Sequence, residues 1–308
     1  HVSIGVIVIF TEYARQFTRP LNDLANQFNT VLSAIAGAER VFALLDEQQE
    51  EETASAQKHH LLGHVAFKHV FFKYEQEEEA YTLKDVDFKV EPGQSVALVG
   101  ATGAGKTTIL QLIARFYEVT KGEVLFDGIN VQQIDRQSLR SQMAFVLQDP
   151  FLFEASVREN IRYGRLDASD AEIEEAAKRA NAHDFIMKLK DGYETVLAAD
   201  GREISQGQKQ LLSIARALIA DPKILLLDEA TSSIDTVTEM AIQEALDTLM
   251  QGRTSFVIAH RLNTVHNADL VLVMHKGELV EAGPQQKLIE SGGLYAQMLH
   301  SSSHHLEE

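Results

Sequence analysis

The chain has 308 residues, of which 45% are apolar, so it can form one large folded domain or two. Its formal net charge of −17 and the lack of a basic block argue against a nucleic-acid-binding surface, because neutralising phosphates needs clustered Lys and Arg. The absence of cysteine excludes disulfides and thiolate sites, which fits a reducing compartment. Because the first residue is His1 instead of Met, we expect a fragment of a longer chain.

The first part of the sequence has the pattern of a long helix. Residues 2–10 are apolar, but this run is far shorter than the roughly 20 residues that span a bilayer, so we interpret it as the end of a membrane helix. Apolar residues continue at near-helical spacing from Phe17 to Leu45, and Pro20 predicts a kink. We therefore expect one long, broken helix leaving a membrane. Periodicity alone also allows a soluble amphipathic helix packed on its own domain.

A charged stretch at residues 46–57 lacks large apolar side chains and predicts a solvated linker, where we place the domain boundary. Four histidines follow within eleven positions, at His59, His60, His64 and His69. A metal site is one interpretation, but we favour a structural one. No carboxylate or cysteine ligand pattern accompanies them, and residues 64–72 alternate as a strand.

Tyr74 ends that strand, and a second strand is expected at residues 83–90. An aromatic residue at this place is by default part of the core. Tyr74 also lies just upstream of a glycine-rich loop, so the alternative is that its ring stacks on a nucleotide base.

The glycine-rich loop is GATGAGKTT, residues 100–108, between an apolar run at 96–99 and an amphipathic helix. Strand, loop and helix in this order are the context that a phosphate-binding loop requires. Its glycines leave the path of an anion to the backbone N–H groups open, and the helix N-terminus adds a positive dipole. In this pattern Lys106 reaches the outer phosphates, the Thr107 hydroxyl ligates magnesium, and Thr108 supports an inner phosphate.

Two further strands carry polar residues at their carboxyl ends, where ligands of open α/β sheets gather. The strand at residues 143–147 is followed by Gln148, and the apolar strand at 224–227 is followed by Asp228 and Glu229. Two adjacent acids are costly without a cation opposite them, and magnesium would serve. His260 follows a later strand at 254–258, which favours a catalytic place.

Helices separate these strands. Ser169 and Glu172 have the spacing of a capping box at the start of a helical insert, and Ser205 with Gln208 has it again in the segment ISQGQ. The latter N-terminus is therefore a second anion site. We also expect Thr236 to cap a helix, a hairpin at residues 270–280, a C-terminal helix from about residue 285, and disorder from residue 301.

Taken together, the chain resembles the nucleotide-binding domain of an ATP-binding cassette (ABC) transporter of the exporter type, over nearly everything from about residue 64 to 300. The motifs occur in the family's order: the A-loop aromatic Tyr74, the Walker A segment 100–108, the Q-loop residue Gln148, the signature ISQGQ at 204–208, the Walker B segment ILLLDE at 224–229, the D-loop SSID at 232–235 and the switch histidine His260. Residues 1–45 are similar to the last membrane helix of such exporters and its cytoplasmic extension.

The resemblance implies an α/β fold: a P-loop NTPase, ABC-type ATPase core with an antiparallel β subdomain and a helical signature subdomain, preceded by the end of a transmembrane helix. It divides the chain into the helix at 1–45, a linker at 46–60, the ABC domain at 61–300 and a disordered tail at 301–308. The implied cofactors are ATP and Mg²⁺. The implied function is ATP hydrolysis that powers export of a drug, lipid or peptide across a membrane.

The resemblance also implies roles for single residues. Glu229 is the general base, His260 holds the γ-phosphate, and Gln148 serves both the reaction and the metal, which Thr107 and Asp228 also bind. Ser205 and Gly207 complete the nucleotide site of a partner domain, identical or different, so that two head-to-tail domains enclose two nucleotides. The expected nucleotide-binding residues are Tyr74, Gly100, Thr102, Gly103, Ala104, Gly105, Lys106, Thr107, Thr108, Ser205, Gly207 and Gln208.

The implied location is a bacterial cell membrane, spanned several times, with the nucleotide-binding domain in the cytoplasm and no nucleic-acid partner. Two departures from the family pattern stand out. Gln206 replaces the first glycine of the usual LSGGQ signature, and Ala199 stands where exporters commonly have glutamate, with Asp200 beside it. One rival is a soluble ABC-type ATPase that acts on nucleic acid or the ribosome. Another is a silent cassette that only binds ATP.

Overall fold

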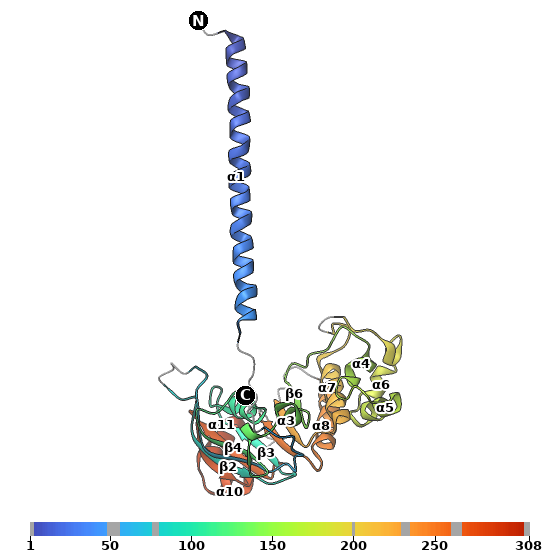
Figure 1. Ribbon diagram of the computed structural model, residues 1–308. Coiled ribbons are helices and arrows are strands. Elements are labelled where there is room, and N and C mark those ends of the chain that lie inside the picture. Colours follow the sequence, from blue (N-terminus) through green and yellow to red (C-terminus); the bar gives the residue numbers. More distant parts are fainter. Residues whose placement is uncertain are drawn as a thin grey trace. The chain divides into compact units, whose positions relative to one another are not determined.

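The computed structural model describes residues 3–47, 56–75, 80–198, 201–228, 235–259 and 267–304. The chain divides into two units, His1–Glu51 and Glu52–Glu308 (Figure 1).

The first unit contains one helix, α1 (Ile4–Leu45), capped by Ser3. We expected a break at Pro20, but the helix continues through it (Figure 1). Proline removes a single backbone donor, and the remaining bonds of a 42-residue helix maintain the conformation on both sides. All of its described side chains are exposed, and it is long and apolar enough to cross a membrane.

The centre of the second unit is a six-stranded sheet with strand order β10-β9-β3-β8-β7-β6. Neighbouring strands from β9 to β6 are parallel, and β10 pairs antiparallel with β9. The strands are β3 (Ser95–Val99), β6 (Met143–Val146), β7 (Ile224–Asp228), β8 (Thr254–Ile258), β9 (Leu270–His275) and β10 (Glu278–Gly283).

Strand β7 shows how this sheet is covered on both faces. Ile224 and Leu226 are buried in the core that contains α2 (Lys106–Ile113), whereas Leu225 and Leu227 are buried in the core that contains α7 (Gln206–Ala220). Alternate side chains of a strand point to opposite faces, so an unbroken apolar run is the pattern of a strand with helices on both sides. The predicted strand at 224–227 is therefore confirmed.

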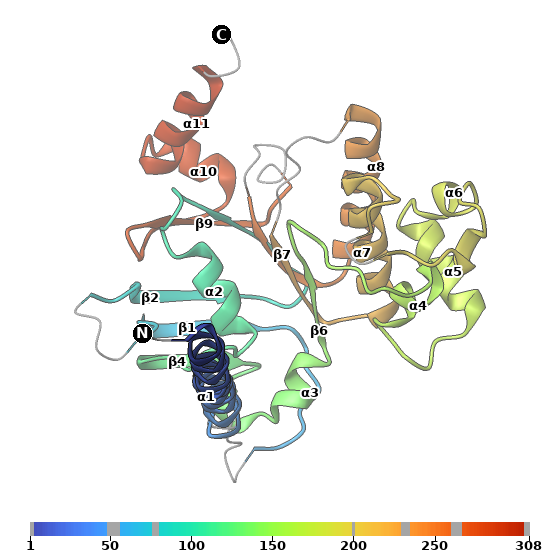
Figure 2. The ribbon, with the colours of Figure 1, turned by 90° about the horizontal axis from the view of Figure 1, so that it is seen from above.

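A second sheet has four strands in the order β2-β1-β4-β5 and is antiparallel. It consists of β1 (Val65–Phe72), β2 (Leu83–Val90), β4 (Lys121–Phe126) and β5 (Ile129–Asn130), followed by η1 (Val131–Gln133) and α3 (Arg136–Arg140). Figure 2 shows α2 beside this sheet. The stacked rings of Phe67 and Phe88, whose centroids are 4.5 Å apart, connect β1 to β2.

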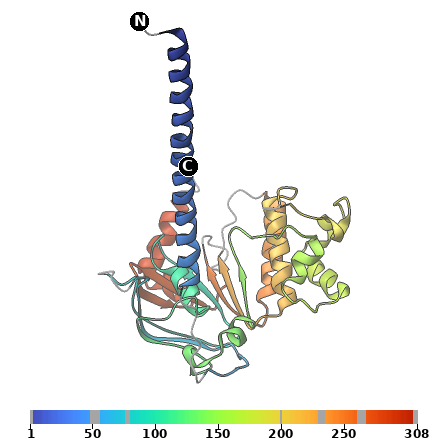
Figure 3. The ribbon, with the colours of Figure 1, turned by 45° about the horizontal axis from the view of Figure 1, so that its top comes forward.

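The helical part consists of α4 (Val157–Arg162), α5 (Asp170–Arg179), α6 (His183–Ile186), η2 (Gly192–Glu194), α7 and α8 (Thr236–Met250). In Figures 2 and 3 the yellow-green helices α4 to α6 gather beside α7 and α8, away from the antiparallel sheet. Their apolar faces form one core with β7, so this insert is packed onto the six-stranded sheet through α7.

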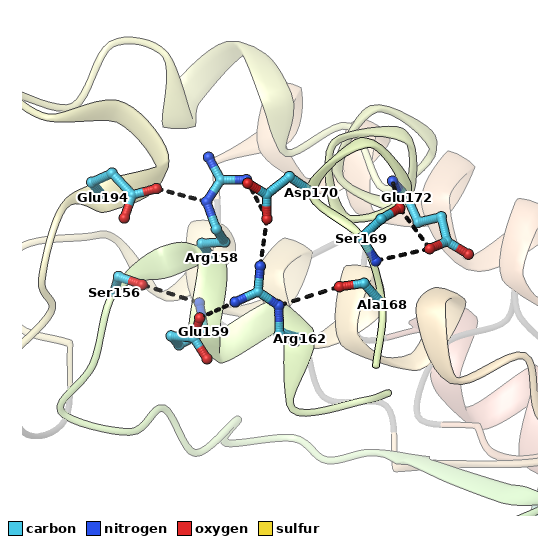
Figure 4. Close-up of polar contacts among 9 residues, drawn as sticks. All are labelled: Ser156, Arg158, Glu159, Arg162, Ala168, Ser169, Asp170, Glu172 and Glu194. Carbon is cyan, nitrogen blue, oxygen red and sulfur yellow. Dashed lines mark hydrogen bonds and ion pairs between the residues drawn. The ribbon is translucent and has the colours of Figure 1, made fainter. Parts of the chain in front are cut away.

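Ion pairs reinforce the join between α4 and α5 (Figure 4). Arg158 donates through Nε to Glu194 at 2.6 Å, and its Nη1 lies 3.4 Å from Asp170. Arg162 pairs with the same Asp170 and also donates to the carbonyl of Ala168 at 3.3 Å. One carboxylate thus holds two guanidinium groups of the neighbouring helix, a network that contributes more than isolated surface pairs do.

Two local expectations need correction. Asp235, not Thr236, is the N-cap of α8, because the Asp235 carboxylate accepts the N–H of Thr238 at 3.0 Å. The C-terminal segment forms two helices, α10 (Gln285–Glu290) and α11 (Leu294–His304), instead of one. Helix α11 runs to His304 and residues 305–308 lie outside the described residues, so the tail that we expected to be disordered from residue 301 stays a prediction. The buried Tyr295 anchors the start of α11.

Candidate functional site

A pocket of about 390 Å³ lies at the carboxyl ends of the parallel strands. The lining residues come from the segment between β1 and β2, the loop before α2, the first turn of α2, and the ends of β6, β7 and β8. They are Tyr74, Thr82, Thr102, Gly103, Gly105, Lys106, Thr107, Thr108, Gln148, Asp228 and Ile258. The structure thus brings together most of the residues that the sequence assigned to the nucleotide. Gly100 and Ala104 belong to the same loop but are not among the lining residues.

Two glycines of the loop are required for different reasons. Gly105 has φ +101°, a left-handed conformation that favours glycine, and it precedes α2 without a side-chain cap. The first N–H groups of α2 therefore have no capping side chain and remain available to an anion. At Gly100, a Cβ would lie 2.3 Å from the carbonyl oxygen of Met274 in β9. The constraint there is contact with the neighbouring strand, which the sequence did not suggest.

Lys106 opens α2 and is buried. Its ammonium group donates to the carbonyl oxygens of Gly100 at 2.7 Å and Ala101 at 3.0 Å. Burial lowers the pKa of Lys106, and the nearby negative charge of Asp228 opposes this shift. The loop thus holds a desolvated cation at the pocket wall, where an anionic ligand can replace the carbonyl contacts with a charge-assisted bond.

Tyr74 also lines the pocket. Its hydroxyl donates to Gln111 Oε1 at 2.7 Å and lies 2.9 Å from Thr108 Oγ1. Its ring meets those of Phe72 and Tyr117 edge to face, with centroids 4.9 and 5.1 Å away. Tyr74 as a whole is nevertheless 42% exposed. The packing on Phe72 and Tyr117 fits the core interpretation, and the exposed part leaves room for a stacked base, which stays a prediction.

The donor set for a cation also lies in this pocket. Thr107, Gln148 and Asp228 line it together and supply a hydroxyl, an amide carbonyl and a carboxylate. All three donors are oxygens, the ligands that Mg²⁺ prefers. The residues present therefore fit magnesium. Glu229 and His260, expected to act on the water and the γ-phosphate, lie outside the described residues, as do Ala199 and Asp200.

The signature residues form a separate feature. Ser205 caps α7, its Oγ accepting the N–H of Gln208 at 3.3 Å, and the Gln208 side chain accepts the N–H of Ser205 at 2.9 Å. Gly207 is buried in the first turn. The predicted capping box is confirmed, and none of these residues is among those that line the pocket. A ligand there would reach this helix end from outside the pocket of the same chain.

Thr82 and Ile258 also line the pocket, and no motif in the sequence predicted them. Ile258 pairs with Asp228 across β8 and β7, so its place follows from the strand order, which a single sequence does not reveal. Thr82 immediately precedes β2, and Leu83, the first residue of that strand, packs close to Gly105. The only signal for either residue was its position beside a strand end.

Comparison with known proteins places this site in a family. The profile of the ABC transporter family matches residues 83–232. The chain is 59% identical over 302 residues to an uncharacterized ABC transporter ATP-binding protein of Bacillus subtilis, covering 97% of this chain and 50% of that protein. It is 46% identical to a fatty acid ABC transporter ATP-binding/permease protein of Mycobacterium bovis, covering 96% of this chain and 47% of that protein.

A solved structure of a bacterial Atm1-family ABC exporter with ATP bound is 37% identical, with a TM-score of 0.80 over 97% of this chain and 52% of that one. The chain thus spans about half the length of the relatives that it matches. The fold, the order of the motifs and the comparisons all indicate the same family. The chain belongs to the ABC transporter family and contains its ATP-binding domain.

Proposed function

We propose that this pocket binds ATP with magnesium and hydrolyses it, and that hydrolysis powers export of a substrate across a membrane. The observation that carries the proposal is the convergence of Lys106, Gln148 and Asp228, from three distant parts of the sequence, on one pocket beside an uncapped helix N-terminus. The Lys106 ammonium group can bind phosphate oxygens, and the Gln148 amide and the Asp228 carboxylate can bind the metal ion of a metal-bound polyphosphate.

In the proposed reaction, a water molecule attacks the γ-phosphorus, the bond to the bridging oxygen breaks, and ADP and inorganic phosphate leave. Glu229 takes the proton of the water, and His260 contacts the γ-phosphate. Lys106 stabilises charge on the outer phosphate oxygens. Magnesium bound by Thr107, Gln148 and Asp228 would neutralise charge on the phosphates.

The transport role rests on relatives and on α1. The names of two relatives, a fatty acid transporter and an ATP-dependent lipid A-core flippase of Saccharophagus degradans, 44% identical, support export of a lipid-class substrate. The exposed apolar helix α1 supports a membrane location. We propose that two such domains, from identical or different chains, close on two nucleotides and move membrane helices attached to them.

The test uses the full-length protein in lipid nanodiscs. We expect saturable, magnesium-dependent phosphate release from ATP, abolished by Lys106→Ala with an unchanged thermal unfolding profile in the absence of nucleotide. The matched control is Lys84→Ala on β2, a lysine outside the pocket lining. Normal hydrolysis by Lys106→Ala would contradict the assignment of the loop. ATP binding without hydrolysis in the parent would instead favour a silent cassette.

A further inference from the structure

The side chain of Gln206 donates through Nε2 to Oδ1 of Asp149, at 3.1 Å, across 57 positions of the sequence. Gln206 is the residue that departs from the glycine of the signature pattern, and glycine has no side chain to make this bond. We propose that Gln206 is a positioning residue that couples the Gln148 loop to α7, and thereby couples the chain's own nucleotide pocket to the helix end that faces a partner's nucleotide. This inference rests on the proposed function.

On the α7 side, the bond is independent of the helix cap. Ser205 and Gln208 make the two reciprocal capping bonds. Gln206 is the first residue of the helix, is exposed, and is not needed for either bond. Its side chain can therefore be changed while the capping box remains, which makes the contact separable from the folding of α7.

On the other side, Asp149 directly follows Gln148, which lines the pocket. The same loop is anchored to α7 a second time, where Arg216 donates to the carbonyl of Phe151 at 2.9 Å. Arg216 lies ten residues beyond Gln206, about 15 Å along the helix at 1.5 Å per residue. Directly after the second anchor, Leu152 is buried in the same core as α7. The loop thus follows α7, and the Gln206 bond is the anchor next to Gln148.

The size of this coupling can be measured. ATP bound in the chain's own pocket would fix the position of Gln148, and the bond from Asp149 to Gln206 would then fix the first turn of α7. In the same way, a partner's ATP bound at α7 would fix the Gln148 loop. Such couplings are reciprocal and typically correspond to about 5- to 150-fold in affinity. For one exposed bond we expect the low end, about a 5-fold rise in the KM for ATP on its loss, with a lower Hill coefficient and a kcat near that of the parent.

Four variants of the full-length protein in nanodiscs test this. Gln206→Glu places a carboxylate against Asp149 and should raise KM, although a negative charge at the first turn does not harm the helix itself. Asp149→Asn keeps an acceptor oxygen and should resemble the parent. The double variant Gln206→Glu with Asp149→Asn restores a hydrogen bond of reversed polarity and should recover the parental KM and Hill coefficient. Gln206→Gly should show the loss without repulsion.

Hydrogen exchange gives a readout that does not need hydrolysis. On ATP addition, protection should rise in residues 148–153 and 206–211 of the parent, and it should rise less in residues 206–211 of Gln206→Glu, where only the partner's nucleotide still protects them. A double variant as impaired as Gln206→Glu alone would overturn the proposal, because the new carboxylate would then act on a phosphate and not on Asp149. Parental behaviour of Gln206→Glu and Gln206→Gly would overturn it too. Failure of the proposed function shows separately, as absent hydrolysis in the parent.

Discussion

The hydroxyl oxygen of Tyr74 lies 2.9 Å from that of Thr108, the threonine in the first turn of the helix that follows the phosphate loop. Tyr74 follows β1 of the antiparallel sheet, and Thr108 lies in α2, which packs against the six-stranded sheet. Together with the bond to Gln111, this contact fixes the tyrosine next to the loop.

The first prediction separates the ring of Tyr74 from its hydroxyl. Stacking of a base on an aromatic side chain is worth about 1 to 3 kcal/mol, so Tyr74→Ala should weaken ATP binding by roughly 5- to 150-fold. Tyr74→Phe keeps the ring and its contacts with Phe72 and Tyr117 and should bind like the parent. Equilibrium binding of a fluorescent ATP analogue measures both. If the Phe variant is as weak as the Ala variant, the hydroxyl bonds matter and stacking does not.

The second prediction concerns pH. Tyr193 is buried, its hydroxyl lies 2.9 Å from Nδ1 of His183, and burial raises its pKa from 10.0 to about 12. The unfolded chain therefore loses this proton at lower pH than the folded domain does. The stability contribution of neutral Tyr193 is present below pH 10 and is lost progressively as pH rises from about 10 to 12.

Thermal unfolding of parent and Tyr193→Phe between pH 9 and pH 11.5 measures this effect. Other tyrosines titrate in both proteins, so the difference between the two isolates Tyr193. We expect the parent to lose Tm relative to the variant as pH rises above about 10. A constant difference over the whole range would mean that Tyr193 ionises as readily folded as unfolded.

The third prediction concerns Asn160, a buried polar residue in α4. Its Oδ1 accepts the N–H of Phe153 at 2.9 Å and Nη2 of Arg216 at 3.1 Å, and its Nδ2 donates to the carbonyl of Phe153 at 3.0 Å. Asn160→Ala leaves these groups without a partner, which costs roughly 1 to 3 kcal/mol. Calorimetry should show a lower Tm, whereas Asn267→Ala at an exposed position should not change it. An unchanged Tm for Asn160→Ala would show that water replaces the amide.

Local sequence patterns predicted the phosphate loop and the helix caps better than they predicted which distant residues contact each other around the pocket. The phosphate loop and both capping boxes are encoded within a few residues, because the chemistry of a turn or helix start depends on its immediate neighbours. The contact of Gln206 with Asp149 and the place of Ile258 depend on strand order and on the packing of α7. Strand order and helix packing are long-range properties, so a single sequence shows which residue types are present but not which of them contact each other.

The misplaced cap of α8 has a local cause. Asp235 and Thr236 are adjacent residues that both favour the N-cap position, and the Thr236-to-Glu239 spacing also fits a capping box. The structure chooses Asp235, whose carboxylate accepts N–H bonds that lower its pKa. At Pro20 the local pattern was misleading for a different reason: proline usually ends or kinks a helix, but here it lies inside α1.

The last prediction tests whether the signature helix acts on a partner's nucleotide. Removing a general base typically costs about 10² to 10⁴ in rate and leaves ground-state binding nearly intact, so Glu229→Gln should bind ATP and retain it between two domains. Ser205→Arg, added to Glu229→Gln, brings a bulky cation into the N-terminus of α7 and should release that ATP. Nucleotide retained by the full-length protein after rapid gel filtration measures the effect, and ADP should not be retained in either case.

Loss of a helix cap could by itself lower retention, and the chain offers a matched control. Ser169 caps α5 with the same capping box as Ser205, its Oγ accepting the N–H of Glu172 at 3.4 Å, but it lies outside the pocket and the signature. Ser169→Arg in the Glu229→Gln background should therefore cost a similar cap, about 1 kcal/mol, and still retain ATP. In the proposed dimer the N-terminus of α7 would supply N–H groups and dipole to the trapped γ-phosphate, so only Ser205→Arg should open the dimer. Equal loss in both variants would mean that domain stability, not contact with a partner's nucleotide, governs retention, and an unchanged retention in Ser205→Arg would show that α7 does not act across the dimer.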